Sequence, residues 1–380
     1  MTLAALLPSR LLTPAGFVQG RCVVIDDGRI AAIVPAGECP ANARKLAGDL
    51  LPGFIDLQVN GGRGVLFNDQ PTVEGIGHIG QAHRRFGTTG FLPTLISDEF
   101  EVIEQAIAAV DAAIAQGVPG VLGIHIEGPF LNPARKGIHD ASRFRTLDAQ
   151  AIALLASLRH GRTLVTLAPE CAPPGAIRAL VDRGVVIAAG HTAASYAEIQ
   201  AGLAEGLSGF THLFNAMTQL GSREPGVVGA ALDSRETWCG LIADGHHVHP
   251  AAMRIALAAK GAERIALVTD AMPTVGWEGR EFKLGGQRIV EAGGRLTGAD
   301  GTLAGSNLDM ASAVRNAVEL MGVDLATAVR MASLVPAEVL GIAGERGSVA
   351  PERIADLVLI DARGQVVETW INGISDRVAR

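Results

Sequence analysis

Short apolar runs that are rich in β-branched residues recur along the middle of the chain, and turn residues bound each of them. Eight can be counted: FIDLQV, GFLPTLI, VLGIHIEG, TLVTLAPE, VVIAAGHT, GFTHLFNA, GLIADGHH and IALVTDAM. Each run is too short for a helix and is typical of a buried strand. Most are separated by amphipathic stretches of helical length, such as EFEVIEQAIAAVDAAIAQG. This order predicts an α/β fold in which parallel strands close into a (β/α)8 TIM barrel.

The two ends of the chain show a different pattern, in which apolar and polar positions alternate around tight turns. Residues 20–34 alternate around an Asp-Asp-Gly turn, and residues 354–374 alternate in the same way. Such patterns predict β-hairpins. We therefore expect a small β-sandwich domain built from residues 1–50 and 348–380, with the barrel between them at residues 51–347. The glycine-rich interval 276–301 predicts a β-hairpin insertion after the eighth strand.

Composition limits the classes of function. The 380 residues are 48% hydrophobic and 19% charged, which is enough apolar material for a large core. No apolar run reaches the roughly 20 residues needed to span a bilayer, and the start of the chain lacks a basic region and a cleavage site. We expect a cytoplasmic protein that binds no membrane. A net charge of −7 without a basic cluster argues against nucleic acid as a partner.

The four cysteines are widely scattered. Cys22, Cys39, Cys171 and Cys239 show no Cys-x-x-Cys spacing, which argues against a zinc knuckle or a redox pair. We expect buried free thiols.

Polar residues gather where the predicted strands end. Gln58 and Asn60 end the first strand, and later strands end at Glu127, His191, His212, Asp244 with His247, and Asp270. The carboxyl ends of barrel strands share one mouth, where such enzymes hold their active sites. This convergence is hard to explain by core packing and predicts a functional site.

Each of these residues also has an ordinary structural explanation. A lone histidine such as His78 or His160 is more often a surface residue or a satisfied buried one than a ligand. Glu127 differs, because a carboxylate leaving an apolar strand is costly to bury unless it is paired or binds metal. With His191 and His212 it forms a set typical of a catalytic zinc site that keeps a position open for water. Asp270 could carry the proton, although an Asp after a strand is also a common helix N-cap.

At this point the motifs resemble a known family, the N-acetylglucosamine-6-phosphate deacetylases of the amidohydrolase superfamily. The resemblance runs in order through LPGFIDLQVNGG, HIEGPFLNPARKGIH, GHT, THLFNAM, REPG, ADGHHVH, TDAM, GTLAGS and ADLVLID. It therefore covers nearly the whole chain. The resemblance implies removal of acetate from N-acetyl-D-glucosamine 6-phosphate, in amino-sugar catabolism or cell-wall recycling.

The resemblance also implies roles for individual residues. Glu127, His191 and His212 would bind the metal, and Asp270 would be the general acid and base. His139 would hydrogen-bond the amide carbonyl and support the oxyanion. The sugar and its phosphate would contact further residues, which are Ile138, Asn215, Ala216, Arg223, His247 and the loop Leu303, Ala304 and Gly305. Family members are generally dimers, so a homodimer is expected, and phosphate contacts can come from the partner subunit.

Several alternatives stay open at this stage. His246 and His249 stand beside His247 and could take its place. N-acetylgalactosamine 6-phosphate differs from the glucosamine compound at one hydroxyl, and no motif excludes it. A barrel that serves as a non-catalytic scaffold is the rival of another class. Zinc suits the nitrogen and oxygen ligands, but iron, manganese or cobalt could fill the same site.

The first strand decides how many metals to expect. Many metal hydrolases built on a barrel carry His-x-His at this place, whereas this chain carries Gln58 and Asn60. Neutral amide side chains are poor ligands for zinc and similar divalent metals, but they are good hydrogen-bond partners. We therefore expect one divalent metal per subunit, with Gln58 and Asn60 filling the second position and holding water or polar side chains.

Overall fold

A computed structural model describes residues 4–378. Its centre is a barrel of eight strands that are hydrogen-bonded in chain order, and every neighbouring pair is parallel. The strands are β6 (Phe54–Val59), β9 (Thr88–Ile96), β10 (Gly123–Glu127), β11 (Arg162–Leu167), β12 (Val186–Ala189), β13 (Gly209–Phe210), β14 (Trp238–Ile242) and β15 (Ile265–Val268). Each of the eight predicted runs overlaps one of them, which confirms the predicted (β/α)8 fold.

The barrel closes just beyond β15. The Asp270 N–H donates to the Gln58 carbonyl at 3.0 Å, and the Asn60 N–H donates to the Ala271 carbonyl at 2.9 Å. Asp56 reinforces the same seam, because its buried carboxylate accepts from the Thr269 hydroxyl at 2.5 Å. The first and last strands are thus joined at the level where Gln58 and Asp270 leave the barrel.

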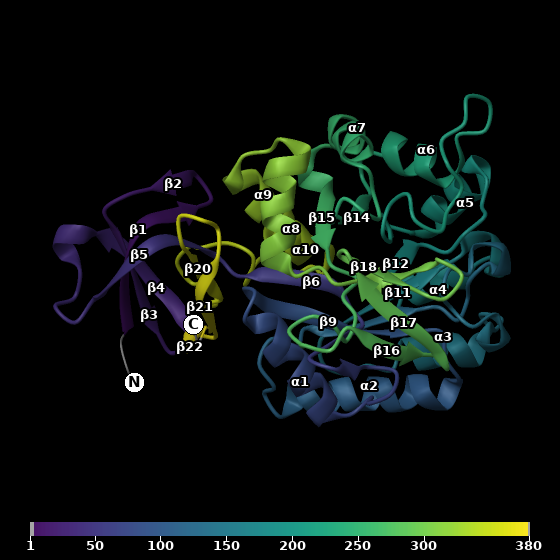
Figure 1. Cartoon of the computed structure of the whole chain (residues 1–380), viewed down its shortest axis with the longest axis horizontal. Helices are drawn as coiled ribbons and strands as arrows, with labels where there is room; N and C mark the ends of the chain where they lie inside the picture. The colour runs from purple at the N-terminus through teal and green to yellow at the C-terminus, as the bar shows by residue number, and fades with distance from the viewer. Residues whose placement is uncertain (1–3, 379–380) are drawn as a thin grey trace.

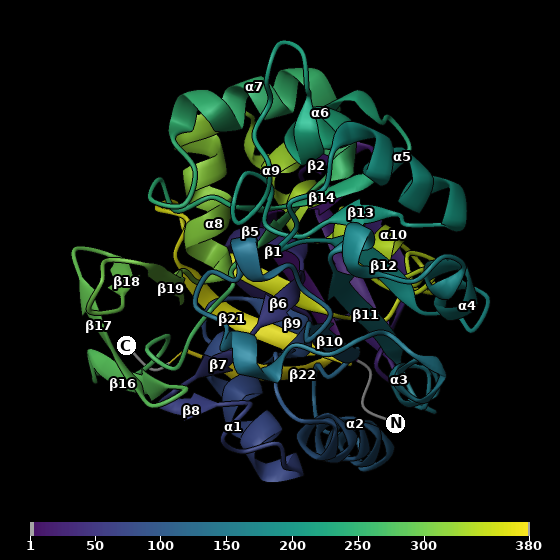
Figure 2. The same ribbon diagram turned by 90° about the vertical axis from the view of Figure 1, so that its right-hand side faces the viewer.

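Helices surround the barrel, as Figure 2 shows. They are α1 (Val73–Arg84), α2 (Phe100–Ala115), α3 (Ala149–Leu155), α4 (Ala176–Val181), α5 (Tyr196–Glu205), α6 (Gly226–Asp233), α7 (Pro250–Lys260), α8 (Met310–Asn316), α9 (Leu325–Ala332) and α10 (Leu334–Val339). Capping residues fix several starts; at α5, Ser195 and Glu198 form a capping box. None of the helices between residues 4 and 378 combines the length and apolarity required to cross a membrane.

Strands from both ends of the chain share one eight-stranded sheet (Figure 1). They are β1 (Ala4–Thr13), β2 (Gly16–Val18), β3 (Arg21–Asp26), β4 (Arg29–Pro35), β5 (Arg44–Pro52), β20 (Leu357–Ile360), β21 (Val366–Ile371) and β22 (Ile374–Arg377). The two ends of the chain meet where β5 pairs with β20. The sheet curls around its own core, in which Val23, Leu50 and Trp370 are buried together.

The expectation of four buried free thiols is wrong for the terminal sheet. Cys22 and Cys39 form a disulfide, with a Cα–Cα separation of 5.9 Å. Cys22 lies in β3, and the turn after β4 brings Cys39 back beside it, which a spacing rule for Cys-x-x-Cys motifs does not detect. Of the two free thiols, Cys239 is buried and Cys171 is exposed.

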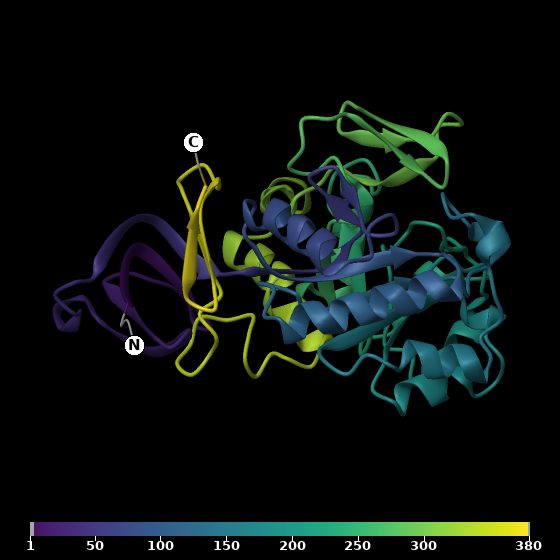
Figure 3. The ribbon, with the colours of Figure 1, turned by 90° about the horizontal axis from the view of Figure 1, so that it is seen from below.

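The glycine-rich interval folds as a four-stranded antiparallel sheet beside the barrel (Figure 3). Its strands are β16 (Glu281–Leu284), β17 (Gln287–Ala292), β18 (Arg295–Thr297) and β19 (Leu303–Ser306). The β16–β17 hairpin lies within the predicted interval, whereas β19 lies beyond it and contains the residues that we expected in a loop. Leu284, Ile289 and Leu296 pack against Met272 and Ile138, which anchors the insertion at the mouth of the barrel.

Candidate metal and catalytic site

A cavity of about 360 Å³ opens at the carboxyl ends of the barrel strands. Residues from six different strand ends and from β19 line it. The predicted site residues among them are Glu127, Ile138, His139, His191, His212, Asn215, Ala216, His247, Asp270, Leu303 and Gly305. A larger cavity of about 1030 Å³ lies along the terminal sheet and contains none of them. The chemistry predicted from the sequence therefore meets in the smaller cavity.

Three of these residues bring their ligand atoms to one point. Glu127 Oε1 lies 3.2 Å from His191 Nε2 and 3.0 Å from His212 Nε2, and the two imidazole nitrogens are 3.0 Å apart. Zinc–ligand bonds of about 2.0–2.2 Å in a tetrahedron place neighbouring ligand atoms about 3.3 Å apart. The triangle therefore fits a metal ion bound by Glu127, His191 and His212.

The charges and tautomers of this group suit ligation. Burial raises the pKa of the Glu127 carboxyl, but the neighbouring His191 and His212 outweigh that effect and hold the pKa well below its ordinary value. His191 Nδ1 lies 2.9 Å from the Arg135 carbonyl, so it donates there and leaves the Nε2 lone pair free. This second hydrogen bond is the usual means by which proteins orient a metal-binding histidine.

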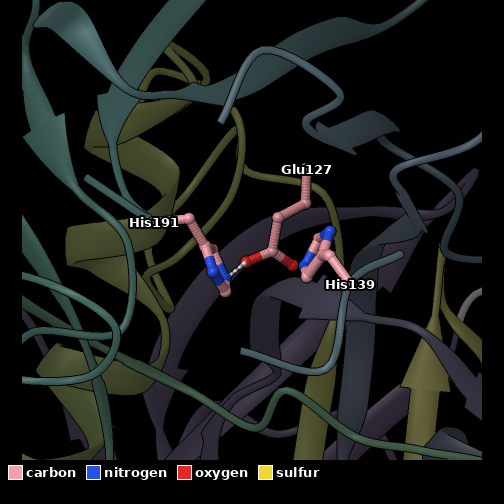
Figure 4. A group of neighbouring side chains, drawn as sticks. All are labelled: Glu127, His139 and His191. Atoms are coloured by element: carbon pink, nitrogen blue, oxygen red, sulfur yellow. Dashed lines mark ion pairs between the residues drawn. The ribbon is translucent and has the colours of Figure 1, made fainter. Parts of the chain in front are cut away.

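His139 also lies close to this group. Ligand atoms of Glu127, His139 and His191 all lie within 4.8 Å of one another, and Figure 4 shows the two imidazoles on either side of the carboxylate. The backbone N–H of Ser97 donates to His139 Nδ1 at 3.4 Å, and the Ser97 hydroxyl lies 2.8 Å from the same atom. An N–H can only donate, so Nδ1 is an acceptor and Nε2 carries the proton. His139 therefore presents a hydrogen-bond donor, whereas His212 completes the tighter triangle.

His139 is neutral as well as oriented. Burial, followed by the charge of His191, lowers the pKa of His139 to about 3. Ser97, at the end of β9, was missed by sequence reasoning, because a serine after a strand gives no signal that it will face a histidine far along the chain.

The backbone at the strand ends is unusual. His191, His212 and Asp270 have φ values of +49°, +34° and +53°, in the left-handed region that non-glycine residues rarely adopt. Such strain persists where the surrounding structure enforces it, and it is common at functional sites. Here each left-handed residue is the second residue after its strand, and each of the three side chains lines the cavity.

Asp270 is held by the two amides of the first strand. Asn60 Nδ2 donates to Asp270 Oδ1 at 2.6 Å, and Gln58 Nε2 lies 3.1 Å from both Asp270 Oδ1 and Glu127 Oε2. Burial, followed by the charge of Glu127, raises the pKa of Asp270 to about 6. The amide groups therefore face two carboxylates, in the place where a His-x-His pair would put imidazoles.

The three neighbouring histidines of ADGHHVH have different environments. His247 lines the cavity, and its Nδ1 lies 2.6 Å from Asp244 Oδ2. His246 Nδ1 accepts from Arg295 of β18 at 3.3 Å. His249 caps α7 by accepting from the Ala251 N–H at 3.1 Å. His246 and His249 therefore have structural partners outside the cavity, and His247 is the one of the three that lines it.

Two predicted residues are not brought to the cavity. Arg223 is exposed in the loop between β13 and α6 and is absent from the lining. Ala304 is fully buried in the core of the insertion, because alternation along β19 turns it away while Leu303 and Gly305 face the cavity. The substrate contacts of Arg223 and Ala304 therefore stay predictions.

Arg135 is a lining residue that sequence reasoning missed. It is half-buried in a 3-10 turn (Pro133–Arg135) on the loop between Glu127 and His139, and it is the arginine of the cavity lining. The pair Arg135-Lys136 in NPARKGIH was the available signal, because a basic pair between two predicted site residues marks a cationic loop.

The sequence profile of the Amidohydrolase family matches residues 50–375. The chain belongs to this family. Its members are metal-dependent hydrolases, and this chain holds a possible metal-binding group in the same cavity.

Individual relatives show which members of the Amidohydrolase family this chain is similar to. The chain is 42% identical over 370 residues to an N-acetylgalactosamine-6-phosphate deacetylase of Shewanella sp. (strain ANA-3), covering 96% of this chain and 94% of the relative. It is 34% identical over 375 residues to an N-acetylglucosamine-6-phosphate deacetylase of Haemophilus influenzae, covering 97% and 98%. A crystal structure of N-acetylglucosamine-6-phosphate deacetylase from Pasteurella multocida superimposes with a TM-score of 0.95 at 32% identity, covering 99% of this chain and 100% of that one. The chain thus belongs to the family that contains these N-acetylgalactosamine-6-phosphate and N-acetylglucosamine-6-phosphate deacetylases.

Proposed function

We propose that this amidohydrolase hydrolyses the acetamide of N-acetyl-D-glucosamine 6-phosphate to D-glucosamine 6-phosphate and acetate. The observation that carries the proposal is the Glu127, His191 and His212 triangle beside Asp270 in one cavity. A non-catalytic scaffold would gain nothing from two buried carboxylates that repel each other, so the hydrolase is the better explanation.

Glu127, His191 and His212 would hold one divalent metal. When bound, such an ion lowers the pKa of water and polarises a carbonyl oxygen. We propose zinc, because nitrogen and oxygen ligands in a tetrahedral arrangement suit it, with iron, manganese and cobalt as the alternatives.

Asp270 would move the proton. As an anion it can accept a proton from the attacking water, and as an acid it can return that proton to the amine nitrogen when the C–N bond breaks. Asn60 and Gln58 donate to the same oxygen, Asp270 Oδ1, which leaves Oδ2 for the water. The amides would therefore orient the base as well as fill the second metal position.

His139 would stabilise the charge that develops on the acetamide oxygen. Its neutral ring carries the proton on Nε2 because Ser97 occupies Nδ1. A donor held in place before the reaction stabilises an oxyanion at little reorganisation cost.

The rest of the cavity would hold the sugar phosphate. Asn215 and Ala216, with Ile138, Leu303 and Gly305, would contact the sugar, and His247 would contact the phosphate. Arg135 offers a cationic contact from within the same chain. We further propose a homodimer, in which Arg223 of each chain would reach the phosphate bound by the other, since it is exposed and does not line its own cavity.

The galactosamine epimer is the second candidate substrate. The higher identity to an N-acetylgalactosamine-6-phosphate deacetylase, 42% against 34%, favours it. Acetate release should be measured with both sugar phosphates at matched enzyme and metal concentrations. A kcat/KM at least tenfold higher for the glucosamine compound would support the first proposal, whereas the reverse ratio would replace it with the second. Release from neither substrate would contradict the function as a whole.

The cellular setting follows from the chemistry of the product. D-glucosamine 6-phosphate would enter amino-sugar catabolism or cell-wall recycling, and we propose a cytoplasmic location. In the reducing cytosol, Cys22 and Cys39 would be held as two thiols, because disulfides rarely persist there.

A further inference from the structure

Glu170 follows β11 in a 3-10 turn (Pro169–Cys171) and bonds to both neighbouring loops. Its Oε1 accepts from Asn132 Nδ2 at 2.9 Å and from the Ala193 N–H at 2.7 Å. Its Oε2 accepts from the Thr192 hydroxyl at 2.5 Å. Glu170 thus joins a loop that follows β10 to a loop that follows β12.

The position of β11 explains this geometry. β11 pairs with β10 on one side and with β12 on the other, as the neighbouring labels in Figure 2 show. β10 ends at Glu127 and β12 leads into His191, whereas β11 contributes no residue to the cavity lining. A carboxylate after β11 is therefore placed between two loops that both serve the site.

The loops held by Glu170 are also bonded to each other at His191. The Asn132 N–H donates to the His191 carbonyl at 3.0 Å, and His191 Nδ1 donates to the Arg135 carbonyl at 2.9 Å. Thr192 and Ala193, which donate to Glu170, directly follow His191. The third donor, Asn132, also donates its backbone N–H to the His191 carbonyl. Moving Glu170 would move the His191 backbone, and with it the direction of Nε2.

We propose that Glu170 is a positioning residue, which holds His191 in its left-handed conformation and fixes the loop that carries Arg135 and His139. Hydrogen bonds to an ionised acceptor are roughly twice as strong as neutral ones, so a carboxylate can maintain a strained backbone where a neutral group would not. The inference rests on the metal-binding role proposed for His191.

Metal affinity and ligand-field spectra test this inference directly. Co(II) should be titrated into the chelated full-length protein against a competing chelator, with the visible spectrum recorded for wild type, Glu170→Gln and Thr192→Val. Mutation of groups that orient ligands typically lowers metal affinity 10–100-fold. We expect Glu170→Gln to weaken Co(II) binding by about tenfold at the least and to shift the d–d bands, while Thr192→Val has a smaller effect in the same direction.

Matched variants separate positioning from general stability. Glu205 also bridges two segments, since it accepts from the Gly175 and Arg178 N–H groups, but it touches no site loop. Glu205→Gln should leave the affinity and the spectrum unchanged, and Thr192→Ser, which keeps the hydroxyl, should restore wild-type binding. Unfolding temperatures of the metal-free variants report the purely structural effect.

The Co(II) titrations distinguish failure of the positioning role of Glu170 from failure of the proposed metal site. If Glu170→Gln and Thr192→Val bind Co(II) with wild-type affinity and spectrum, the inference is overturned. The inference is also overturned if Glu205→Gln loses as much Co(II) affinity as Glu170→Gln does. If the wild type itself binds no Co(II), the proposed metal site fails instead, and that result is distinguishable because it appears before any variant is compared.

Discussion

Asp270→Asn removes the proposed general base while keeping the size of the side chain. In the structure Asp270 Oδ1 accepts from Asn60 and Gln58, and an asparagine carbonyl oxygen can accept the same two bonds. The amide cannot take a proton from water. General acid and base catalysis contributes about 10²–10⁴-fold, and Asp270 would serve in both directions, so we expect kcat to fall by about 10³-fold or more. The metal content should remain that of the wild type.

The same variant should stabilise the metal-free protein, because the wild-type carboxylate is buried beside Glu127. Burial and that charge raise the pKa of Asp270 from its ordinary 3.8 to about 6. A shift of about two pKa units corresponds to about 3 kcal/mol. The folded state holds the Asp270 proton more tightly than the unfolded chain does. Ionisation of Asp270 therefore lowers the free energy of unfolding. This loss is absent well below pH 4, grows between about pH 4 and pH 6, and is fully present above pH 6.

Urea unfolding of chelated protein at pH 5 and pH 8 measures this effect. Asp270→Asn should raise the free energy of unfolding at both values, by about 1 kcal/mol more at pH 8 than at pH 5. Asp309→Asn is the control, since Asp309 caps α8 and lies outside the cavity. Retained turnover would refute the role of Asp270 as the base. Equal stability of the variant and the wild type at pH 8 would refute the electrostatic account of its environment.

Four further changes test other parts of the site and the fold. His139→Asn should lower kcat by about 10²–10³-fold with metal content unchanged, whereas His212→Asn should lose the metal; elemental analysis of both variants would contradict the assignment if the roles were reversed. Arg135→Ala should raise KM by about tenfold with little change in kcat, because a charge-assisted hydrogen bond contributes about 1.5–3 kcal/mol, and an unchanged KM would exclude a phosphate contact. Replacing Cys22 and Cys39 by serine should lower the stability of the oxidised protein by about 3 kcal/mol, as expected for a short closed loop, without changing kcat; thermal unfolding with and without a reductant provides the check.

The sequence was most informative where a single physical rule determines where a side chain lies in the fold. Strands recur as apolar runs, and parallel strands in a barrel end at one mouth, so Glu127, His191, His212 and Asp270 could be brought together without coordinates. His247 could be preferred over His246 and His249 only through its spacing from Asp244, and the structure adds the partners of the other two.

Contacts between loops that are distant along the chain could not be predicted from the sequence. Ser97 and Glu170 bond to residues of other strand ends, and neither shows a periodic or motif signal. The Cys22–Cys39 pair depends on the turn after β4, and the burial of Ala304 depends on LAGS forming an alternating strand instead of a loop. Arg223 was taken into the site from a motif, and in a single chain its side chain is exposed and does not line the cavity.

The number and necessity of metals in the purified protein test the central claim most directly. The protein should be chelated and then titrated with Zn(II), with bound metal and acetate release from N-acetyl-D-glucosamine 6-phosphate measured at each step. The triangle of Glu127, His191 and His212, with Gln58 and Asn60 filling the neighbouring position, predicts no release without metal and full activity at one equivalent per chain. Full activity in the metal-free protein, or a requirement for two tightly bound equivalents, would contradict this account.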